Sequence, residues 1–219
     1  MGIYPDEVTT FAAVVLYGAP VAVAVLSYLL GCINGAIATS HIFYHDDVRR
    51  HGSGNAGLTN FYRNYGAKCA PMVIAFDMLK AVGAVLLGNY FLGYLLGWGA
   101  AGKYFGALFC VIGHMFPVFY GFKGGKGVSS TCGVMLMTFW WQALICYVIT
   151  IALIAITKFV SLGSLALVVL FGILVTATNW GNWLVIAWVW VIAGLCIYRH
   201  HANIGRLIHG TERKIGQKA

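Results

Sequence analysis

Long apolar segments separated by short polar loops dominate the sequence. Residues 8–44, 128–157 and 159–198 contain no Asp, Glu, Lys or Arg. About 20 apolar residues in an α-helix are enough to span the hydrocarbon core of a bilayer, so each segment can hold at least one membrane-spanning helix. The pattern therefore predicts an all-α membrane protein.

Charged residues and turn signals set the boundaries of the expected spans. We expect the first helix at about residues 11–33, the second at residues 71–87 and the third at residues 91–113. The uncharged residues 159–198 are long enough for two helices, with a turn at residues 176–182. Residues 128–157 are the difficult case. A helix of that length measures about 45 Å at 1.5 Å per residue, and the hydrocarbon core measures about 30 Å.

The distribution of basic residues decides the number of crossings. Residues 49–68 hold four Lys or Arg, residues 123–126 hold two, position 158 is a lysine, and the tail 199–219 holds five. The positive-inside rule places all four segments in the cytoplasm, so the number of crossings between any two must be even. Parity favours two short or partial spans within residues 128–157, turning near residues 139–142.

The expected fold is therefore a bundle of seven transmembrane helices, some of them short, with the N-terminus outside and the C-terminus in the cytoplasm. Five full spans plus a re-entrant pair is the alternative.

Composition agrees with this interpretation. The chain is 60% hydrophobic and 9% charged, whereas soluble domains carry about 25% charged residues. The formal charge of +8 can indicate nucleic-acid binding, but these charges lie in short loops between apolar segments, so we expect no nucleic-acid partner. The six cysteines are scattered without a C-x-x-C pair and are typical of small buried hydrophobes.

Residues 49–68 form the most polar stretch, and they are rich in glycine. Exposed backbone N–H groups, short polar side chains and fixed positive charge are what an anion site requires. A dinucleotide-binding reading of the G-x-G-x-x-G pattern fails, because that motif needs a preceding strand and a membrane helix precedes it here. A flexible cytoplasmic loop remains the alternative. The candidate anion-binding residues are Ser53, Gly54, Asn55, Thr59, Asn60 and Arg63.

A second glycine-rich segment, GFKGGKG at residues 121–127, precedes a helix that we expect to begin near Val128. It is not a P-loop, because Gly127 stands where that motif needs a hydroxyl after the lysine. The N-terminus of a helix can nevertheless bind phosphate. The candidates are Lys123, Gly124, Gly125 and Lys126, and the alternative is two lysines that only obey the positive-inside rule.

Two further pairs stand out. Asp77 and Lys80 are spaced i, i+3 inside an apolar segment, which suits either a structural ion pair or a contribution to a substrate site. His200 and Asn203 share a helix face where the last span ends. No carboxylate or cysteine lies near them at metal-ligand spacing, so a general base or a hydrogen-bond donor is favoured over a metal site. An interfacial histidine without a function is the alternative.

Three stretches together resemble the bacterial acyl-phosphate:glycerol-3-phosphate acyltransferase family: RRHGSGNAGLTNFYRNYG (49–66), GHMFPVFYGFKGGKGV (113–128) and YRHHANIGRLIHGTE (198–212). FDMLK (76–80) and SLGS (161–164) also fit. One position departs from the family pattern. The family usually has Gly-Ser-hydrophobic-Pro near the end of the first helix, and this chain has Gly-Cys-Ile-Asn at residues 31–34.

The resemblance implies a single membrane domain over residues 1–219, located in the bacterial cytoplasmic membrane with its active site facing the cytoplasm. It implies transfer of an acyl group from acyl phosphate to the 1-hydroxyl of glycerol 3-phosphate, giving lysophosphatidic acid and phosphate without metal, other cofactor or acyl-CoA. The expected partners are these two substrates and membrane lipids, and we expect a monomer. A transporter for an organic phosphate is the competing hypothesis.

The resemblance also assigns roles to residues. The implied catalytic residues are His200, Asn203, Ser53 and Arg63. The implied substrate-binding and phosphate-binding residues are Gly54, Asn55, Thr59, Asn60, Lys123, Gly124, Gly125, Lys126, Ser161, Ser164 and Lys80.

Overall fold

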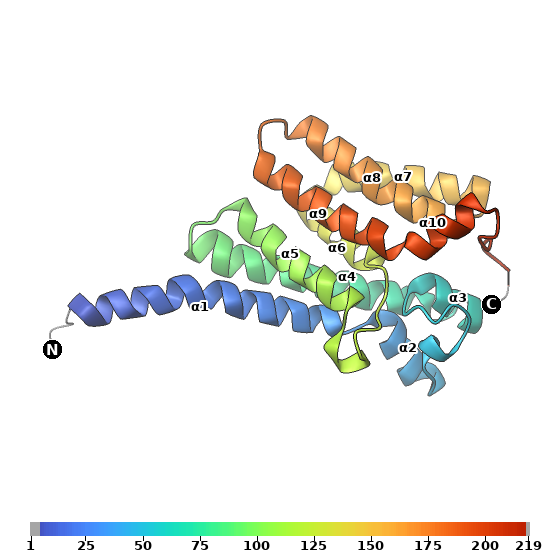
Figure 1. The fold of residues 1–219 in the computed structure, drawn as a ribbon, viewed down its shortest axis with the longest axis horizontal. Helices are drawn as coiled ribbons and strands as arrows, with labels where there is room; N and C mark the ends of the chain where they lie inside the picture. The colour runs from blue at the N-terminus through green and yellow to red at the C-terminus, as the bar shows by residue number, and fades with distance from the viewer. Residues whose placement is uncertain (1–4, 218–219) are drawn as a thin grey trace.

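The computed structural model describes residues 5–217, and these residues form helices and loops without any strand (Figure 1). Lys218, counted above in the basic tail, lies outside the described residues. The helices are α1 (Pro5–Cys32), α2 (Gly35–Tyr44), α3 (Leu58–Tyr65), α4 (Ala70–Gly88), α5 (Ala100–Met115), α6 (Val128–Thr138), α7 (Trp140–Thr157), α8 (Val160–Thr178), α9 (Trp183–Arg199) and α10 (His201–Ile208). Short helical turns lie at Val48–Arg50 and Val118–Tyr120, and a π-helix at Asn89–Leu95.

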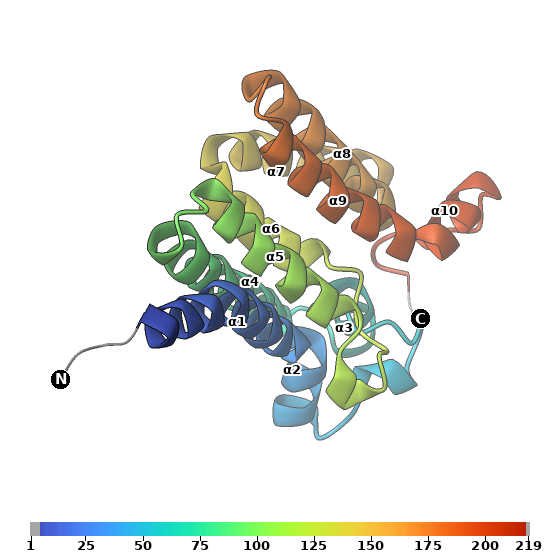
Figure 2. The ribbon, with the colours of Figure 1, turned by 60° about the vertical axis from the view of Figure 1, so that its left-hand side comes forward.

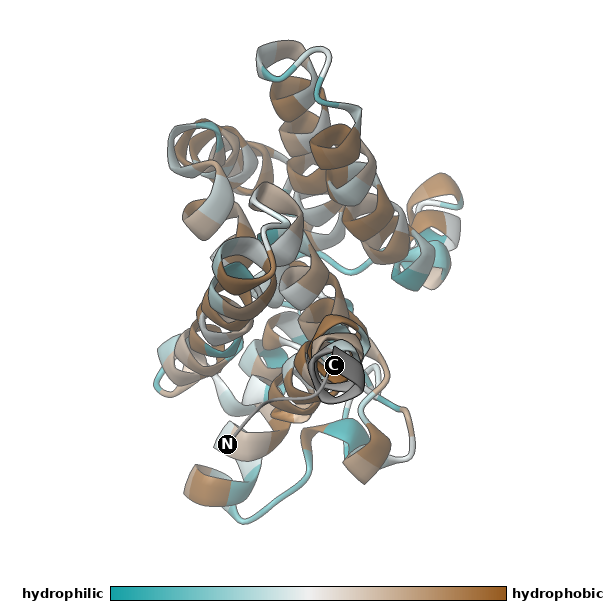
Figure 3. Cartoon of the chain, turned by 90° about the vertical axis from the view of Figure 1, so that its left-hand side faces the viewer, coloured by the Kyte–Doolittle hydropathy of each residue, from teal (hydrophilic) through white to brown (hydrophobic). Residues whose placement is uncertain are grey.

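The long helices form two groups that lie side by side. Helices α1, α4 and α5 pack together on one side, and α7, α8 and α9 pack together on the other (Figures 1 and 2). Helix α6 contacts α4 and α5 in the first group and α7 in the second. In Figure 3 most of the length of the long helices has the colours of apolar residues, as expected of helices that cross a membrane. A pocket is lined by residues from both groups, so the packing of one group against the other positions the site.

Small residues allow the first group to pack closely. A Cβ atom on Gly31 of α1 would collide with the carbonyl group of Cys110, and one on Gly113 of α5 would collide with the carbonyl of Tyr28. Close backbone contact through small residues is the usual way in which helices associate in lipid. Gly31 and Gly113 therefore have a structural role.

Five segments are long and apolar enough to cross a membrane: Ala12–Cys32, Ala70–Leu95, Ala100–Tyr120, Trp140–Thr157 and Val160–Thr178. A sixth is added if α9 and α10, which meet at 61°, count as one bent span. Helix α6 has 11 residues. The chain thus has the helices of a multi-pass membrane protein, and an expected total of seven requires α6 to be counted as a short span.

The turns within the two long uncharged segments are confirmed. Residues 128–157 divide at Phe139 into α6 and α7, and α8 and α9 are joined by residues 179–182. The predicted start of the third span at residue 91 is wrong. The π-helix Asn89–Leu95 prolongs α4, and the turn follows at Gly97 and Gly99, whose φ angles of 73° and 55° suit glycine. Helix α5 therefore begins at Ala100.

Asn34 holds the break between α1 and α2, where the family pattern has a proline. Its Oδ1 accepts a hydrogen bond from the backbone N–H of Ile37 at 3.0 Å, which caps the N-terminus of α2. Its Nδ2 donates to the carbonyl of Ala56 at 3.0 Å. The departure from the family pattern at this position therefore keeps the break and ties it to the glycine-rich segment.

Candidate active site

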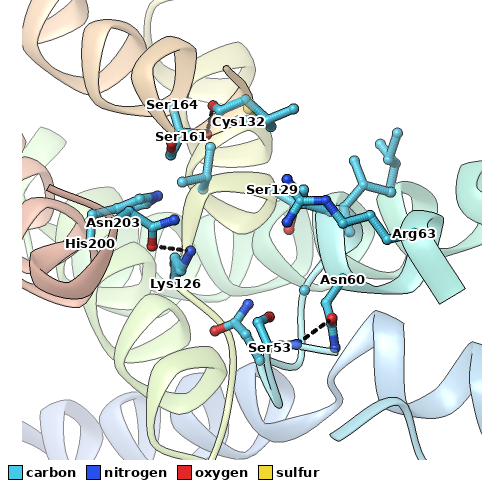
Figure 4. A pocket seen from close by; sticks show the side chains of 18 of the residues that line it. Ser53, Asn60, Arg63, Lys126, Ser129, Cys132, Ser161, Ser164, His200 and Asn203 are labelled. Carbon is cyan, nitrogen blue, oxygen red and sulfur yellow. Dashed lines mark hydrogen bonds between the residues drawn. The ribbon is translucent and has the colours of Figure 1, made fainter. Parts of the chain in front are cut away.

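A pocket of about 430 Å³ is lined by residues from both groups of helices and from the two glycine-rich basic segments (Figure 4). Figure 4 shows one wall formed by Lys126, His200 and Asn203 and another formed by Ser53, Asn60 and Arg63. Residues from the two glycine-rich segments, from α8 and from α10 meet here although they are far apart in the sequence. The pocket therefore brings together the three stretches that the sequence singled out.

Asn60 shapes the first glycine-rich segment. Its Oδ1 accepts a hydrogen bond from the backbone N–H of Ser53 at 3.0 Å. Its Nδ2 donates to the carbonyls of Val48 and His51 at 3.0 and 3.1 Å. The side chain is 2% exposed and all its polar groups are engaged. Asn60 therefore fixes the loop that presents Ser53 to the pocket.

Lys126 projects from the second glycine-rich segment and donates a hydrogen bond to Oδ1 of Asn203 in α10. The pKa of Lys126 is lowered to about 8, chiefly because burial penalises the charged ammonium. Glu212 opposes this shift in the pKa of Lys126, whereas Arg206 and Arg63 add to it. An anion in the pocket would stabilise the charged ammonium of Lys126 and so oppose both effects on its pKa.

Glu212 is the only carboxylate among the described residues that line the pocket. Its Oε1 accepts hydrogen bonds from Ser161 Oγ at 2.8 Å and from Asn203 Nδ2 at 2.7 Å, and its Oε2 accepts from Arg206 Nε at 2.7 Å. Burial alone would raise the pKa of Glu212, but the hydrogen bonds from Asn203, Ser161 and Arg206 lower it overall. Glu212 thus joins the C-terminal segment to α8 and α10.

Arg63 closes the cationic side of the pocket. Its Nη2 donates to the carbonyl of Arg213 at 2.9 Å, whereas its buried Nε has no hydrogen-bond partner among the described residues. Three cations, Arg63, Lys126 and Arg206, thus line a pocket that contains one carboxylate, Glu212. The excess of positive charge and the unpaired donor make this half of the pocket suited to an anion.

His200 lines the pocket where α9 ends and is 3% exposed. Its Nδ1 lies 2.7 Å from the carbonyl oxygen of Cys196. A carbonyl only accepts hydrogen bonds, so Nδ1 carries the hydrogen and, in the neutral ring, Nε2 has the free lone pair. No described residue bonds to this Nε2. His200 is thus oriented to accept a proton or a hydrogen bond from a ligand.

The other half of the pocket is apolar. Helices α4, α6, α7 and α8 contribute its lining: Ile74, Met78, Cys132, Tyr147, Ile151 and Val160. Ile74 and Ile151 are exposed at the outer surface of the molecule. The Tyr147 hydroxyl donates to the carbonyl of Cys132 at 2.6 Å, so the polar group of this half is already satisfied. An acyl chain is a ligand that fits such a lining.

Most of the predicted site residues line this one pocket: Ser53, Asn55, Thr59, Asn60, Arg63, Lys126, Ser161, Ser164, His200 and Asn203. Gly54, Lys80, Lys123, Gly124 and Gly125 are outside the lining. Lys123 is exposed and Lys80 is buried. Gly124 and Gly125 pack against His114, and a Cβ on either would collide with it. Gly124 and Gly125 therefore allow the second glycine-rich segment to lie close to His114 behind the pocket wall.

Sequence reasoning missed four polar residues of the lining: His114, Ser129, Arg206 and Glu212. Arg206 follows Asn203 by one helical turn and could have been found by spacing. Glu212 is the only acid in the C-terminal tail, which was a signal for pairing. Among the described residues, no three His, Cys, Asp or Glu side chains are grouped so that they could hold a metal ion.

The sequence profile of a family described as glycerol-3-phosphate acyltransferase matches residues 21–210. A glycerol-3-phosphate acyltransferase of Thermoanaerobacter sp. (strain X514) is 40% identical over 195 residues, which cover 89% of this chain and 95% of the relative. Another from Clostridioides difficile (strain 630) is 40% identical over 197 residues, covering 90% and 95%.

Two solved structures have a similar fold. The glycerol 3-phosphate form of PlsY (YgiH), an integral membrane glycerol 3-phosphate acyltransferase, superposes with a TM-score of 0.81 at 32% identity, covering 91% of this chain and 96% of that one. The lysophosphatidic acid form of the same protein gives a TM-score of 0.79 at 31% identity, with the same coverage.

Proposed function

The chain belongs to the glycerol-3-phosphate acyltransferase family, and from this premise we propose that its pocket transfers an acyl group from an acyl phosphate to the 1-hydroxyl of glycerol 3-phosphate. The protein is an acyltransferase of glycerol 3-phosphate and acts in phospholipid biosynthesis. The products are lysophosphatidic acid and phosphate.

The observation that carries the proposal is the division of the pocket into two halves. Arg63, Lys126 and Arg206 line one end, and an apolar lining that includes the exposed Ile74 and Ile151 forms the other. Glycerol 3-phosphate requires the first half, and an acyl phosphate requires both. The reacting carbonyl would lie at the junction, near His200 and Asn203.

The chemistry needs little beyond positioning and charge. An acyl phosphate is a mixed anhydride, so the hydroxyl oxygen attacks its carbonyl carbon, a C–O bond forms, and the bond from that carbon to the phosphate oxygen breaks. The two bound phosphates hold the reactants in register, and Lys126 with the arginines stabilises the departing phosphate. The hydroxyl proton passes to Nε2 of His200 or to a substrate phosphate.

Seven crossings follow if α6 counts as a short span, and we propose this arrangement with the N-terminus outside and the C-terminus in the cytoplasm. The positive-inside rule supports it. Trp140, Trp180 and Trp183 are exposed at the helix ends away from the pocket, as an aromatic belt at the opposite interface would be. We further propose one monomeric domain in the bacterial cytoplasmic membrane, with the pocket facing the cytoplasm.

The test is an assay of the purified protein in lipid with labelled glycerol 3-phosphate and either palmitoyl phosphate or palmitoyl-CoA. We expect lysophosphatidic acid and equimolar phosphate with palmitoyl phosphate alone. Lys126→Ala should abolish product, and Lys68→Ala, at an exposed lysine outside the pocket, should not.

Product from palmitoyl-CoA as well would overturn the choice of donor. A folded protein that forms no product from either donor, yet moves labelled glycerol 3-phosphate into sealed vesicles, would favour a transporter.

A further inference from the structure

A buried polar cluster behind the pocket has no part in the chemistry described so far. It consists of Asp77 and Lys80 on α4 and His114 on α5, which are 0%, 6% and 1% exposed. The Nζ atom of Lys80 lies 2.9 Å from Asp77 Oδ1 and 2.9 Å from His114 Nδ1. Only His114 of the three belongs to the pocket lining. Burying such groups is costly unless each is satisfied, so their arrangement calls for a reason.

The contacts of Lys80 fix which nitrogen of His114 carries the hydrogen. An ammonium group only donates hydrogen bonds, so Nδ1 of His114 must accept at this distance. The alternative is donation from Nδ1 to Asp77 Oδ1, which is 3.3 Å away. That oxygen accepts a hydrogen bond from the backbone N–H of Gly35 at 3.0 Å and is ion-paired with Lys80. A hydrogen on Nδ1 would also point at the Lys80 ammonium, whose three N–H donors are directed to Gly31, Ile33 and Nδ1 of His114.

The hydrogen of the neutral imidazole is therefore on Nε2. Among the described residues, none accepts a hydrogen bond from this atom. It lies against the backbone of Gly125, where a Cβ would collide with it, in the same segment as Lys126. His114 lines the pocket, and its Nε2 is not among the fully buried atoms that lack a partner, so this N–H is accessible from the pocket. A ligand oxygen in the anion-binding half of the pocket is a suitable acceptor for it.

We propose that His114 is a substrate-contacting residue whose Nε2–H donates a hydrogen bond to a substrate phosphate oxygen, and that Lys80 and Asp77 are positioning residues that hold it in this tautomer. Lys80 also donates to the carbonyls of Gly31 and Ile33 at 3.0 and 2.7 Å, at the end of α1. The buried pair thereby links the break after α1 to the pocket. This inference rests on the proposed function, because it requires a phosphate-bearing ligand.

The test is nitrogen-15 NMR of the wild-type protein in lipid nanodiscs with labelled histidine. There are seven histidines, and the signals that vanish in His114→Gln belong to His114. We expect an unprotonated Nδ1 and a protonated Nε2. Titration with glycerol 3-phosphate or with inorganic phosphate should shift the Nε2 signal to saturation, and saturation at a lower concentration of glycerol 3-phosphate than of inorganic phosphate assigns the contact to the phosphate of that substrate. A hydrogen on Nδ1, or an Nε2 signal that neither probe shifts, would overturn the proposal.

Kinetics add a second measurement. His114→Ala should lower kcat/KM about 10- to 100-fold, the loss of one hydrogen bond to a charged group. His114→Gln, which keeps an N–H donor at a similar reach, should recover most of it. In the same NMR spectra, Lys80→Met should show both tautomers of His114 populated. Equal losses in the Ala and Gln variants, both folded, would contradict a donor role. Product formation by the wild-type protein, measured separately, keeps a failure here distinct from a failure of the proposed function.

Discussion

The ammonium of Lys126 and the amide oxygen of Asn203 form a hydrogen bond between residues 77 positions apart in the chain. The Asn203 amide nitrogen in turn donates to Glu212, which also accepts from Ser161. One side chain from the second glycine-rich segment is thereby fixed by the C-terminal part of the chain. The position of the Lys126 side chain in the pocket therefore depends on the fold of the C-terminal segment.

The lowered pKa of Lys126 predicts a pH dependence of substrate binding. The group loses its proton as the pH rises through about 8, and the neutral amine attracts phosphate less strongly. The second pKa of a phosphate monoester is about 6, so the substrate charge is constant in this range. We expect KM for glycerol 3-phosphate to rise above pH 8 in the wild-type protein. Lys126→Arg keeps its charge at this pH and should show no such rise.

His200 should affect the chemical step. Because Nδ1 donates to Cys196 and Nε2 is left without a partner in a residue that lines the pocket, we expect His200→Ala to remove either the base or a positioning contact. General-base loss corresponds to a fall in kcat of about 10² to 10⁴-fold, with KM little changed. The neighbouring His201 is exposed, so His201→Ala is a matched control that should keep activity. Full activity of His200→Ala would exclude a catalytic role.

Glu212 should matter for stability as well as activity. Its carboxylate accepts three hydrogen bonds, from Ser161, Asn203 and Arg206. Glu212→Ala leaves buried donors unpaired and an arginine without its partner, at a cost of about 3–5 kcal/mol for a buried pair. Arg206 is partly exposed, so the loss of stability should lie at or below the lower end of this range. Thermal unfolding in detergent measures it, and Thr211→Ala, at the exposed neighbouring position, is the control. Unchanged melting would show that the C-terminal segment is not held by this carboxylate.

The sequence predicted the all-α membrane architecture, and most of the predicted site residues line the pocket, because these features depend on local patterns. Uncharged segment lengths located the turns at Phe139 and at residues 179–182, and glycine-rich basic segments located Lys126 and Arg63. The start of α5 was missed because a π-helix prolongs α4, and apolar composition does not distinguish the two. The contacts of Glu212 with Ser161 and of His114 with Lys80 join residues 51 and 34 positions apart, which no local pattern records. Lys80 was correctly suspected of an ion pair with Asp77, but its contact with His114 required the packing of α4 on α5.

Gly125 provides a test of the pocket wall that leaves every charged group in place. A Cβ here would collide with His114 Nε2 and lie 2.6 Å from the carbonyl oxygen of Ala56, so Gly125→Ala must displace the histidine or the glycine-rich segment. We expect a substantial fall in kcat/KM and a rise in KM for glycerol 3-phosphate, because Lys126 is the next residue. Gly205 has open space around its Cβ position in α10, and an alanine in a helix interior is favoured over glycine by about 0.5–1 kcal/mol. Gly205→Ala should therefore stay active and melt no lower than the wild type. If both variants had equal, unchanged kinetics, the close approach at Gly125 would have no functional consequence.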